Sequence, residues 1–372
     1  TSMEALFKNS NFDEDISNWD TRNVTTMAEA FSNSVFNGNI SKWDTSKVTN
    51  MKFMFYYNFH FEGIGGLNTS VQTRKDANGN DEKYLAWDVK NVTDMSYMFS
   101  GSDRMWDATH EYKFNGEISN WNTGNVENMR NMFQWSYSFN QQIGEKTVNF
   151  TGDDYDLGIY KAWDLQKVEN IIEMFRFAEA FNNGVNNSSE DENNVGNPLK
   201  FTFNPNKTVS LTVMFYGAKA FNAPIYHWEN TSSISNTQTM FQGASKFNQE
   251  IRTWNVSGLT TTTDMFKDAT AFIQNYVDYG ATNSPRELFW TLYGGVIKDD
   301  NDVEYRQPNY STDLTIGSNN SKLQGMISFY SASANAKNII KTHAGEPNTW
   351  DVSQITSMEA LFKNSNFDED IS

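Results

Sequence analysis

The chain has 372 residues, of which 15% are aromatic, and its formal net charge is −17. This aromatic content excludes a disordered chain, and the acidic balance argues against nucleic acid as a partner, because phosphate binding needs clustered Lys and Arg. No stretch reaches the roughly 20 apolar residues of a membrane-spanning helix, so no membrane span is expected. The absence of Cys excludes disulfide frameworks and thiolate metal sites.

A repeated pattern occupies residues 1–274. Each copy runs from a Trp to a Met and then to a Met–Phe pair, and the shortest spacing between copies is 24 residues, as from Phe7 to Phe31. A fixed period of this size predicts a solenoid in which neighbouring coils bury each other's apolar face. In the clearest copies we expect the core to comprise Trp43, Val48, Met51, Met54, Phe55, Trp87, Val92, Met95, Met98, Phe99, Trp121, Met132 and Phe133.

Each copy also carries local structural signals. The i, i+3, i+4 spacing of Met51, Met54 and Phe55 predicts a short amphipathic helix. The Ile-Ser-x-Trp segment, as in residues 40–43, predicts a short strand. The predicted fold class is therefore an α/β repeat solenoid. Its leucine-rich-repeat-like coils of about 25 residues would each hold a short helix and a short strand, with β-hairpin insertions.

Insertions interrupt the period. Residues 70–87, 148–160 and 296–305 read as strand, acidic turn and strand, which is typical of a projecting hairpin. Residues 275–342 are interpreted as a degenerate coil or an inserted lobe, after which the solenoid resumes over 343–372. The hairpin insertions are expected near 65–86, 101–113, 144–162 and 183–208.

Residues 1–17 and 356–372 are identical, with the sequence TSMEALFKNSNFDEDIS. The other copies share only their spaced apolar residues, so the core pattern alone does not account for seventeen consecutive matches. We favour a larger repeat of 355 residues, of which this chain shows one unit and an overlap. The alternative is a local duplication of one coil.

Catalysis is not expected, because the four histidines have no recurring partner and no hydrolase or phosphate-binding motif occurs. Calcium is the best candidate for a cofactor. Asp76, Asn78 and Asn80 copy the first three ligand positions of a calcium loop, but Asp81 replaces the expected Gly and no Glu stands at position 12. A plain hairpin turn is the default interpretation of these residues.

Some aromatic residues break the repeat period. We expect them to be exposed as candidate contact aromatics, although some would pack under the insertions. They include Tyr57, Trp106, Trp135 and Trp290.

Residues 43–55, 87–99, 121–143 and 240–254 follow the pattern W-D-[TV]-S-x-V-T-x-M-x-x-M-F-x-x-A-x-x-F-N-x-x-I-S. In this they resemble BspA-type leucine-rich-repeat surface proteins, in the branch found in mycoplasmas and lactobacilli. The resemblance implies a curved solenoid at a cell surface, with adhesive contacts and no catalytic residues. We therefore expect a non-enzymatic extracellular structural or adhesive protein, built as one unit of a tandem array or filament.

The expected partners are further copies, stacked end to end or joined in tandem, and surface proteins of a host or neighbouring cell. The alternative function is a cell-surface adhesin or receptor module that binds host protein or glycan.

Overall fold

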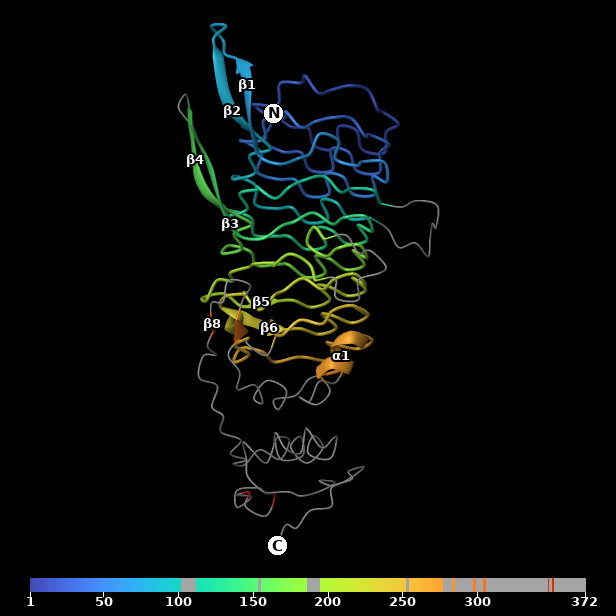
Figure 1. Ribbon diagram of the computed structural model, residues 1–372. Helices are drawn as coiled ribbons and strands as arrows, with labels where there is room; N and C mark the ends of the chain where they lie inside the picture. Colours follow the sequence, from blue (N-terminus) through green and yellow to red (C-terminus); the bar gives the residue numbers. More distant parts are fainter. Residues whose placement is uncertain are drawn as a thin grey trace.

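The computed structural model describes residues 1–101, 112–152, 155–185, 195–251 and 254–276, with the short pieces 283–284, 297–298, 304–305, 347 and 350. In this part, successive Met–Phe segments lie one above another in chain order (Figure 1). Isolated parallel bridges join Ser2 to Thr26, Thr26 to Asn50 and Asn50 to Asp94. We number these segments as repeats 1 to 9 after Phe7, Phe31, Phe55, Phe99, Phe133, Phe175, Phe215, Phe241 and Phe266.

The predicted α/β repeat solenoid is wrong. In the described residues α1 (Thr270–Tyr276) is the only α-helix, η1 (Thr231–Ser233) is a 3₁₀ turn, and the named strands form separate two-stranded sheets. The predicted strand over residues 40–43 is a turn, because the Trp43 N–H donates to the Ile40 carbonyl at 3.1 Å. The repeats are therefore built from turns rather than from a helix and a strand.

The backbone of the Met–Phe segments explains why no helix forms there. Phe53 and Tyr57 have φ of 55° and 58°, and the same two positions are left-handed in most repeats. A right-handed α-helix contains no such residues. A run of turns still places Met51, Met54 and Phe55 on one side, so the apolar spacing alone does not distinguish it from a helix.

Backbone hydrogen bonds join each repeat to the next. In repeat 2, alternate N–H groups donate to carbonyls of repeat 3, while the Ala30 N–H closes a local turn on the Met27 carbonyl. Just before the ladder the Thr25 N–H donates back to the Thr1 carbonyl at 2.9 Å, but the four ladder bonds themselves all run the same way along the stack. They join Met27 to Asn50 at 3.0 Å, Glu29 to Lys52 at 2.9 Å, Phe31 to Met54 at 2.8 Å and Asn33 to Tyr56 at 2.7 Å.

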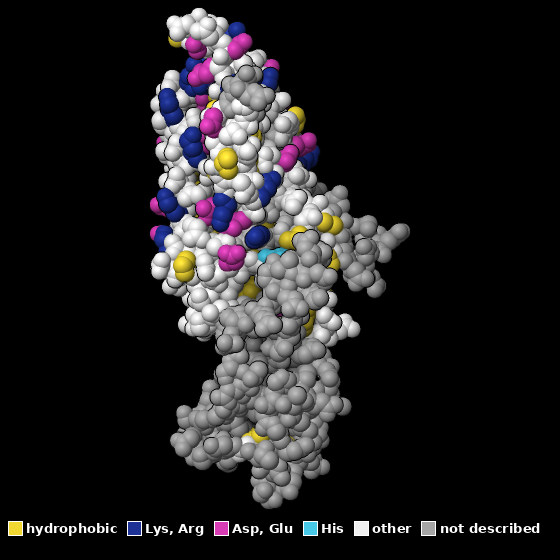
Figure 2. All heavy atoms as spheres, turned by 60° about the vertical axis from the view of Figure 1, so that its left-hand side comes forward, with side chains coloured by type: hydrophobic (Ala, Val, Ile, Leu, Met, Phe, Trp, Pro, Cys, Tyr) yellow, Lys and Arg dark blue, Asp and Glu magenta, His cyan; other side chains and the backbone are white. Residues whose placement is uncertain are grey.

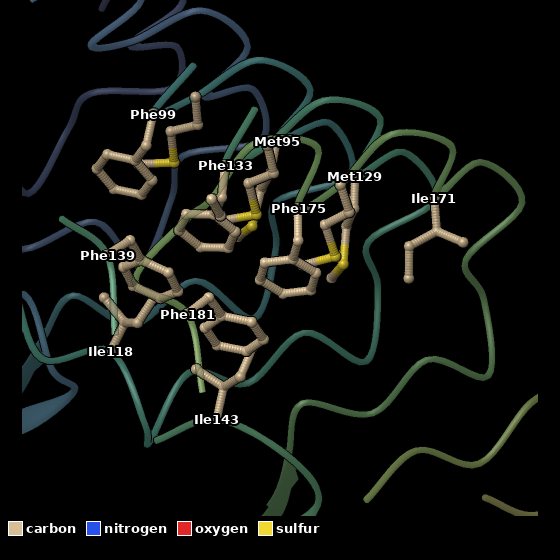
Figure 3. Close-up of a cluster of buried hydrophobic side chains, with 14 of the residues drawn as sticks. Met95, Phe99, Ile118, Met129, Phe133, Phe139, Ile143, Ile171, Phe175 and Phe181 are labelled. Atoms are coloured by element: carbon tan, nitrogen blue, oxygen red, sulfur yellow. The ribbon is translucent and has the colours of Figure 1, made fainter. Parts of the chain in front are cut away.

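The core contains two rows of phenylalanine rings that run through the stack, packed with Met, Ile, Val and Trp side chains (Figure 3). In the first row the ring centres of Phe99 and Phe133 lie 5.7 Å apart, and those of Phe133 and Phe175 lie 5.4 Å apart. Within a repeat the rows touch, as where Phe133 stacks on Phe139 at 4.0 Å. All thirteen residues predicted as repeat core have no exposed surface.

Tryptophans form a second link between repeats. The indole N–H of Trp43 donates to the Ile16 carbonyl at 3.1 Å, and that of Trp87 donates to the Ile40 carbonyl at 2.9 Å. Each buried ring therefore fixes its repeat to the preceding one and satisfies its own donor.

Two hairpins project from the same side of the stack (Figure 1). β1 (Ser70–Lys75) pairs antiparallel with β2 (Asp81–Ala86), and β3 (Lys146–Gly152) with β4 (Tyr155–Ala162). They lie in two of the three ranges for which the sequence predicted a strand, an acidic turn and a second strand. The described pieces of the third range, β7 (Ile297–Lys298) and β8 (Glu304–Tyr305), also pair antiparallel.

The other predicted insertions differ. Of the insertion near 101–113, only residues 101, 112 and 113 are described. The described part of 183–208 holds no strand pair, and its Thr202 makes a parallel bridge to Glu229. A further parallel pair, β5 (Val209–Ser210) and β6 (Ile234–Asn236), joins repeats 7 and 8. Most of 275–342 and nearly all of 343–372 lie outside the described residues.

Candidate functional site

The core needs only the inward residues of each Met–Phe segment, so the outward residues are free for other roles. In repeats 3 and 4 several of these are aromatic and half-buried. The rings of Phe53 and Tyr97 stack with centres 4.7 Å apart, and Tyr56 meets Phe53 edge-on at 4.9 Å. Tyr57 lies 4.3 Å from Tyr56. We call Phe53, Tyr56, Tyr57 and Tyr97 the aromatic cluster.

A cavity of about 350 Å³ adjoins the aromatic cluster. Its other wall is polar, with an ion pair between Lys8 and Glu29 and a hydrogen bond of 2.9 Å from Asn33 Nδ2 to Asn9 Oδ1. Burial is the main cause that raises the pKa of Tyr56, so its hydroxyl stays protonated. The cavity is lined by Lys8, Asn9, Glu29, Ser32, Asn33, Phe53, Tyr56 and Tyr57.

A second group of outward side chains surrounds Arg176. Its guanidinium carbon lies 5.3 Å from the ring centre of Trp135 and 5.6 Å from that of Tyr216, and it pairs with Glu173 at 2.7 Å. Phe177 stacks on Trp135 at 6.3 Å. Trp135 Nε1 and Arg176 Nε are buried and find no hydrogen-bond acceptor among the described residues. Trp, Tyr and Arg are the residue types that dominate contact surfaces.

The root of the first hairpin encloses a polar cavity of about 310 Å³. Arg74 forms ion pairs with Asp44 of the stack and with Glu82 of β2, and its guanidinium lies 4.6 Å from the ring centre of Tyr84. Tyr84 donates to the Lys42 carbonyl at 2.6 Å. These contacts fasten the hairpin to the stack.

The predicted calcium residues Asp76, Asn78 and Asn80 lie at the turn between β1 and β2. Asp76 Oδ1 accepts the backbone N–H groups of Asn78 and Asn80, both at 2.8 Å. The bond from Asn80 is the main reason why the pKa of Asp76 lies below its usual value. Calcium takes six to eight oxygen ligands. In the described residues no three His, Cys, Asp or Glu side chains are grouped to hold a metal ion.

Tyr57 and Trp135, two of the predicted contact aromatics, are half-buried on outward positions of repeats 3 and 5, whereas Trp106 and Trp290 lie outside the described residues. Tyr57 belongs to the aromatic cluster and Trp135 to the group around Arg176, so the structure places them in separate groups. The prediction omitted Phe53 and Tyr97. Both directly precede the second Met of their repeats, so a comparison of outward positions between repeats would have found them.

Family comparison agrees with the repetition seen in the structure. No helix within the described ranges has the length and apolar character needed to span a membrane. No curated protein matches the chain. No solved structure matches it.

One family model matches the chain four times, over residues 1–84, 72–203, 191–288 and 321–372. The last match includes Met326, Phe329 and Tyr330, whose spacing is that of Met51, Met54 and Phe55. The chain is thus a tandem-repeat protein, and it belongs to the family described as "Mycoplasma protein of unknown function, DUF285".

Proposed function

We propose that the chain is a non-enzymatic structural and adhesive protein of the cell exterior, built as one 355-residue unit of a longer tandem array. The supporting observation is that each junction between repeats reuses the same contacts. Phe31 donates to Met54, Phe55 to Met98 and Phe99 to Met132, at 2.8, 2.9 and 2.9 Å. Each repeat therefore stacks on its neighbours alone, and length can grow without a new core.

The identical segments support a tandem array. In residues 1–17, the N–H groups of Met3, Ala5 and Phe7 donate to Thr26, Ala28 and Ala30 of repeat 2. Residues 356–372 have the same sequence, so they carry every side chain that 1–17 uses against repeat 2. We infer that 356–372 begins a further unit.

The extracellular setting is supported by the repeat pattern, and the surface suits a long soluble protein. Figure 2 shows Lys and Arg interspersed with Asp and Glu over the described part of this face, with few exposed apolar side chains. Such a surface keeps a long protein soluble. The resemblance of the repeats to BspA-type surface proteins supports an extracellular location.

Joining two units tests the array. A chain made of residues 1–355 followed by 1–372 merges the identical segments once. We expect one continuous particle by small-angle scattering, with the second unit extending the axis of the first. In a control, a flexible Gly/Ser linker replaces the merged segment and should give two hinged bodies. Two hinged bodies from the merged chain as well would contradict the array.

The location and mass of the native protein provide the second test. We expect protease treatment of intact cells to remove the protein, and its mass under denaturing conditions to be several times 42.6 kDa. Protection from protease would contradict the extracellular proposal. A mass near that of this chain would favour the alternative, a separate surface adhesin or receptor, for which the aromatic cluster is the candidate contact surface.

A further inference from the structure

We propose that the cavity between repeats 1, 2 and 3 binds a neutral oligosaccharide. The rings of Phe53, Tyr56 and Tyr57 would form its apolar wall, and the side chains of repeats 1 and 2 its hydrogen-bonding wall. This inference deepens the adhesive proposal by naming a ligand class. It rests on that proposal only for the source of the glycan.

The fold does not require aromatic residues at these positions. Position 53 corresponds to Glu29 in repeat 2, Asn131 in repeat 5 and Val213 in repeat 7, and all of these have positive φ. Gly and Asn adopt this conformation more easily than an aromatic residue does. The conformation belongs to the repeat, whereas the aromatic side chains of Phe53 and Tyr57 serve neither the turn nor the core, so they are available for contact with a ligand.

The two walls match the two aspects of a sugar ring. A pyranose has a face of C–H groups, which packs on aromatic rings, and a rim of hydroxyls, each of which donates and accepts. The polar wall offers amides from Asn9 and Asn33, a carboxylate from Glu29 and an ammonium from Lys8, so donors and acceptors lie together. The hydroxyl of Tyr56 adds a further polar group. The volume of about 350 Å³ falls within the range of small-molecule sites.

Charge favours a neutral glycan. Lys8 and Glu29 pair with each other, so the lining residues carry no net formal charge. The whole chain has a net charge of −17 and repels anionic sugars. Proline-rich peptides also dock on aromatic grooves. They fit less well, because proline has no N–H to donate to the carboxylate of Glu29.

Glycine substitutions separate binding from folding. Phe53→Gly and Tyr57→Gly each remove a ring from the cavity and place glycine where φ is positive, so the backbone tolerates them. Val213→Gly is the matched control for Phe53→Gly, because it makes the same backbone change at the same repeat position, away from the cavity. The complete chain is titrated by calorimetry with neutral hexose and N-acetylhexosamine oligosaccharides, sialylated and sulfated oligosaccharides, and proline-rich peptides.

We expect binding of a neutral oligosaccharide, weakened about tenfold or more by Phe53→Gly and by Tyr57→Gly and unchanged by Val213→Gly. Three results would overturn the inference. They are the absence of neutral-sugar binding, binding insensitive to both cavity variants, and binding of proline-rich peptides alone through the same residues.

Cell attachment is measured in parallel. Attachment of the unaltered chain without oligosaccharide binding would overturn this inference and leave the adhesive proposal standing. Oligosaccharide binding without attachment would support the site and contradict the adhesive proposal.

Discussion

Left-handed residues set the conformation of the repeats at the residue scale. Two positions in most Met–Phe segments have positive φ, and side chains as different as Phe53, Glu173 and Val213 occupy the first of them. A non-glycine residue costs roughly 1–2 kcal/mol in this conformation. The hydrogen bonds of the ladder and the burial of the core rings must offset this conformational cost. Single positions are therefore open to stabilisation.

Val213 is strained, because it is β-branched and has φ of 62°. We predict that Val213→Asn stabilises the chain by about 1 kcal/mol, since Asn tolerates this conformation and Asn131 already occupies the position in repeat 5. Urea denaturation measures the change. The control Val209→Asn places an amide at a buried strand position and should destabilise. Equal destabilisation by both would contradict the role assigned to strain.

The raised pKa of Tyr160 predicts that the folded chain loses stability at alkaline pH. Burial is the main cause that raises its pKa to about 12, from the usual value of about 10. The folded chain then holds this proton more tightly than the unfolded chain, so the stabilisation is complete below pH 10 and is lost as pH rises towards 12. We expect the melting temperature to fall over this window, and Tyr160→Phe to make the fall shallower. If the melting temperature of Tyr160→Phe falls as steeply with pH as that of the unaltered chain, the loss of stability belongs to other tyrosines.

At the element scale, the first hairpin depends on its root. Asp44 lies in the stack with its side chain 7% exposed, and Arg74 of β1 is its ion-pair partner. Arg74 also pairs with Glu82 on β2, so one guanidinium joins both strands of the hairpin to repeat 3. The hairpin itself exposes most of its turn residues.

We predict that Arg74→Met destabilises the hairpin by roughly 1–3 kcal/mol, because the carboxylate of Asp44 loses its charged partner. Hydrogen exchange in β1 and β2 measures the change against exchange in β3 and β4. Arg74→Met combined with Asp44→Asn should recover part of the loss. If the double variant exchanges as fast as Arg74→Met alone, the ion pair is not what fastens the hairpin.

The period of the repeats and the identity of the core residues can be predicted from the sequence, because residues that recur in each repeat, such as Trp43 and Phe55, are the ones that are buried. The backbone conformation cannot be predicted in the same way, because apolar residues on the inner side of successive turns have the same spacing as those on one face of a helix. Glycine or asparagine would have signalled the left-handed positions, but Phe53 and Tyr57 occupy them in repeat 3. The aromatic cluster combines residues of repeats 3 and 4, so only the structure shows that Phe53 meets Tyr97.

At the scale of the whole molecule, the two rows of phenylalanines connect the repeats into one core. Phe133 stacks on Phe99, Phe139 and Phe175, and it has no exposed surface. In a protein whose repeats touch only their neighbours, a defect in one repeat separates those on either side.

We predict that Phe133→Ala costs about 3–5 kcal/mol and divides unfolding into two transitions, one for the repeats before Phe133 and one for those after it. The hydrogen-exchange rates of the Phe55 and Phe241 amides would then differ, because these residues lie on opposite sides of Phe133. Phe150→Ala, in the half-buried ring of β3, is the control and should leave one transition. A single transition for both variants would show that the stack is cooperative over its whole length.

The ladder bonds that all run one way have an electrical consequence. In a sheet the strand dipoles largely cancel, whereas here the ladder carbonyls of each segment face the preceding repeat and its ladder N–H groups face the following one. Fewer bonds oppose them, such as that from the Thr49 N–H to the Thr25 carbonyl. The peptide dipoles of the ladder therefore add along the stack, as they do in an α-helix. The repeat 1 side is electronegative and the opposite side electropositive. Units joined through this ladder would all point in the same direction, and a fibre made of them would have a carbonyl pole and an amide pole.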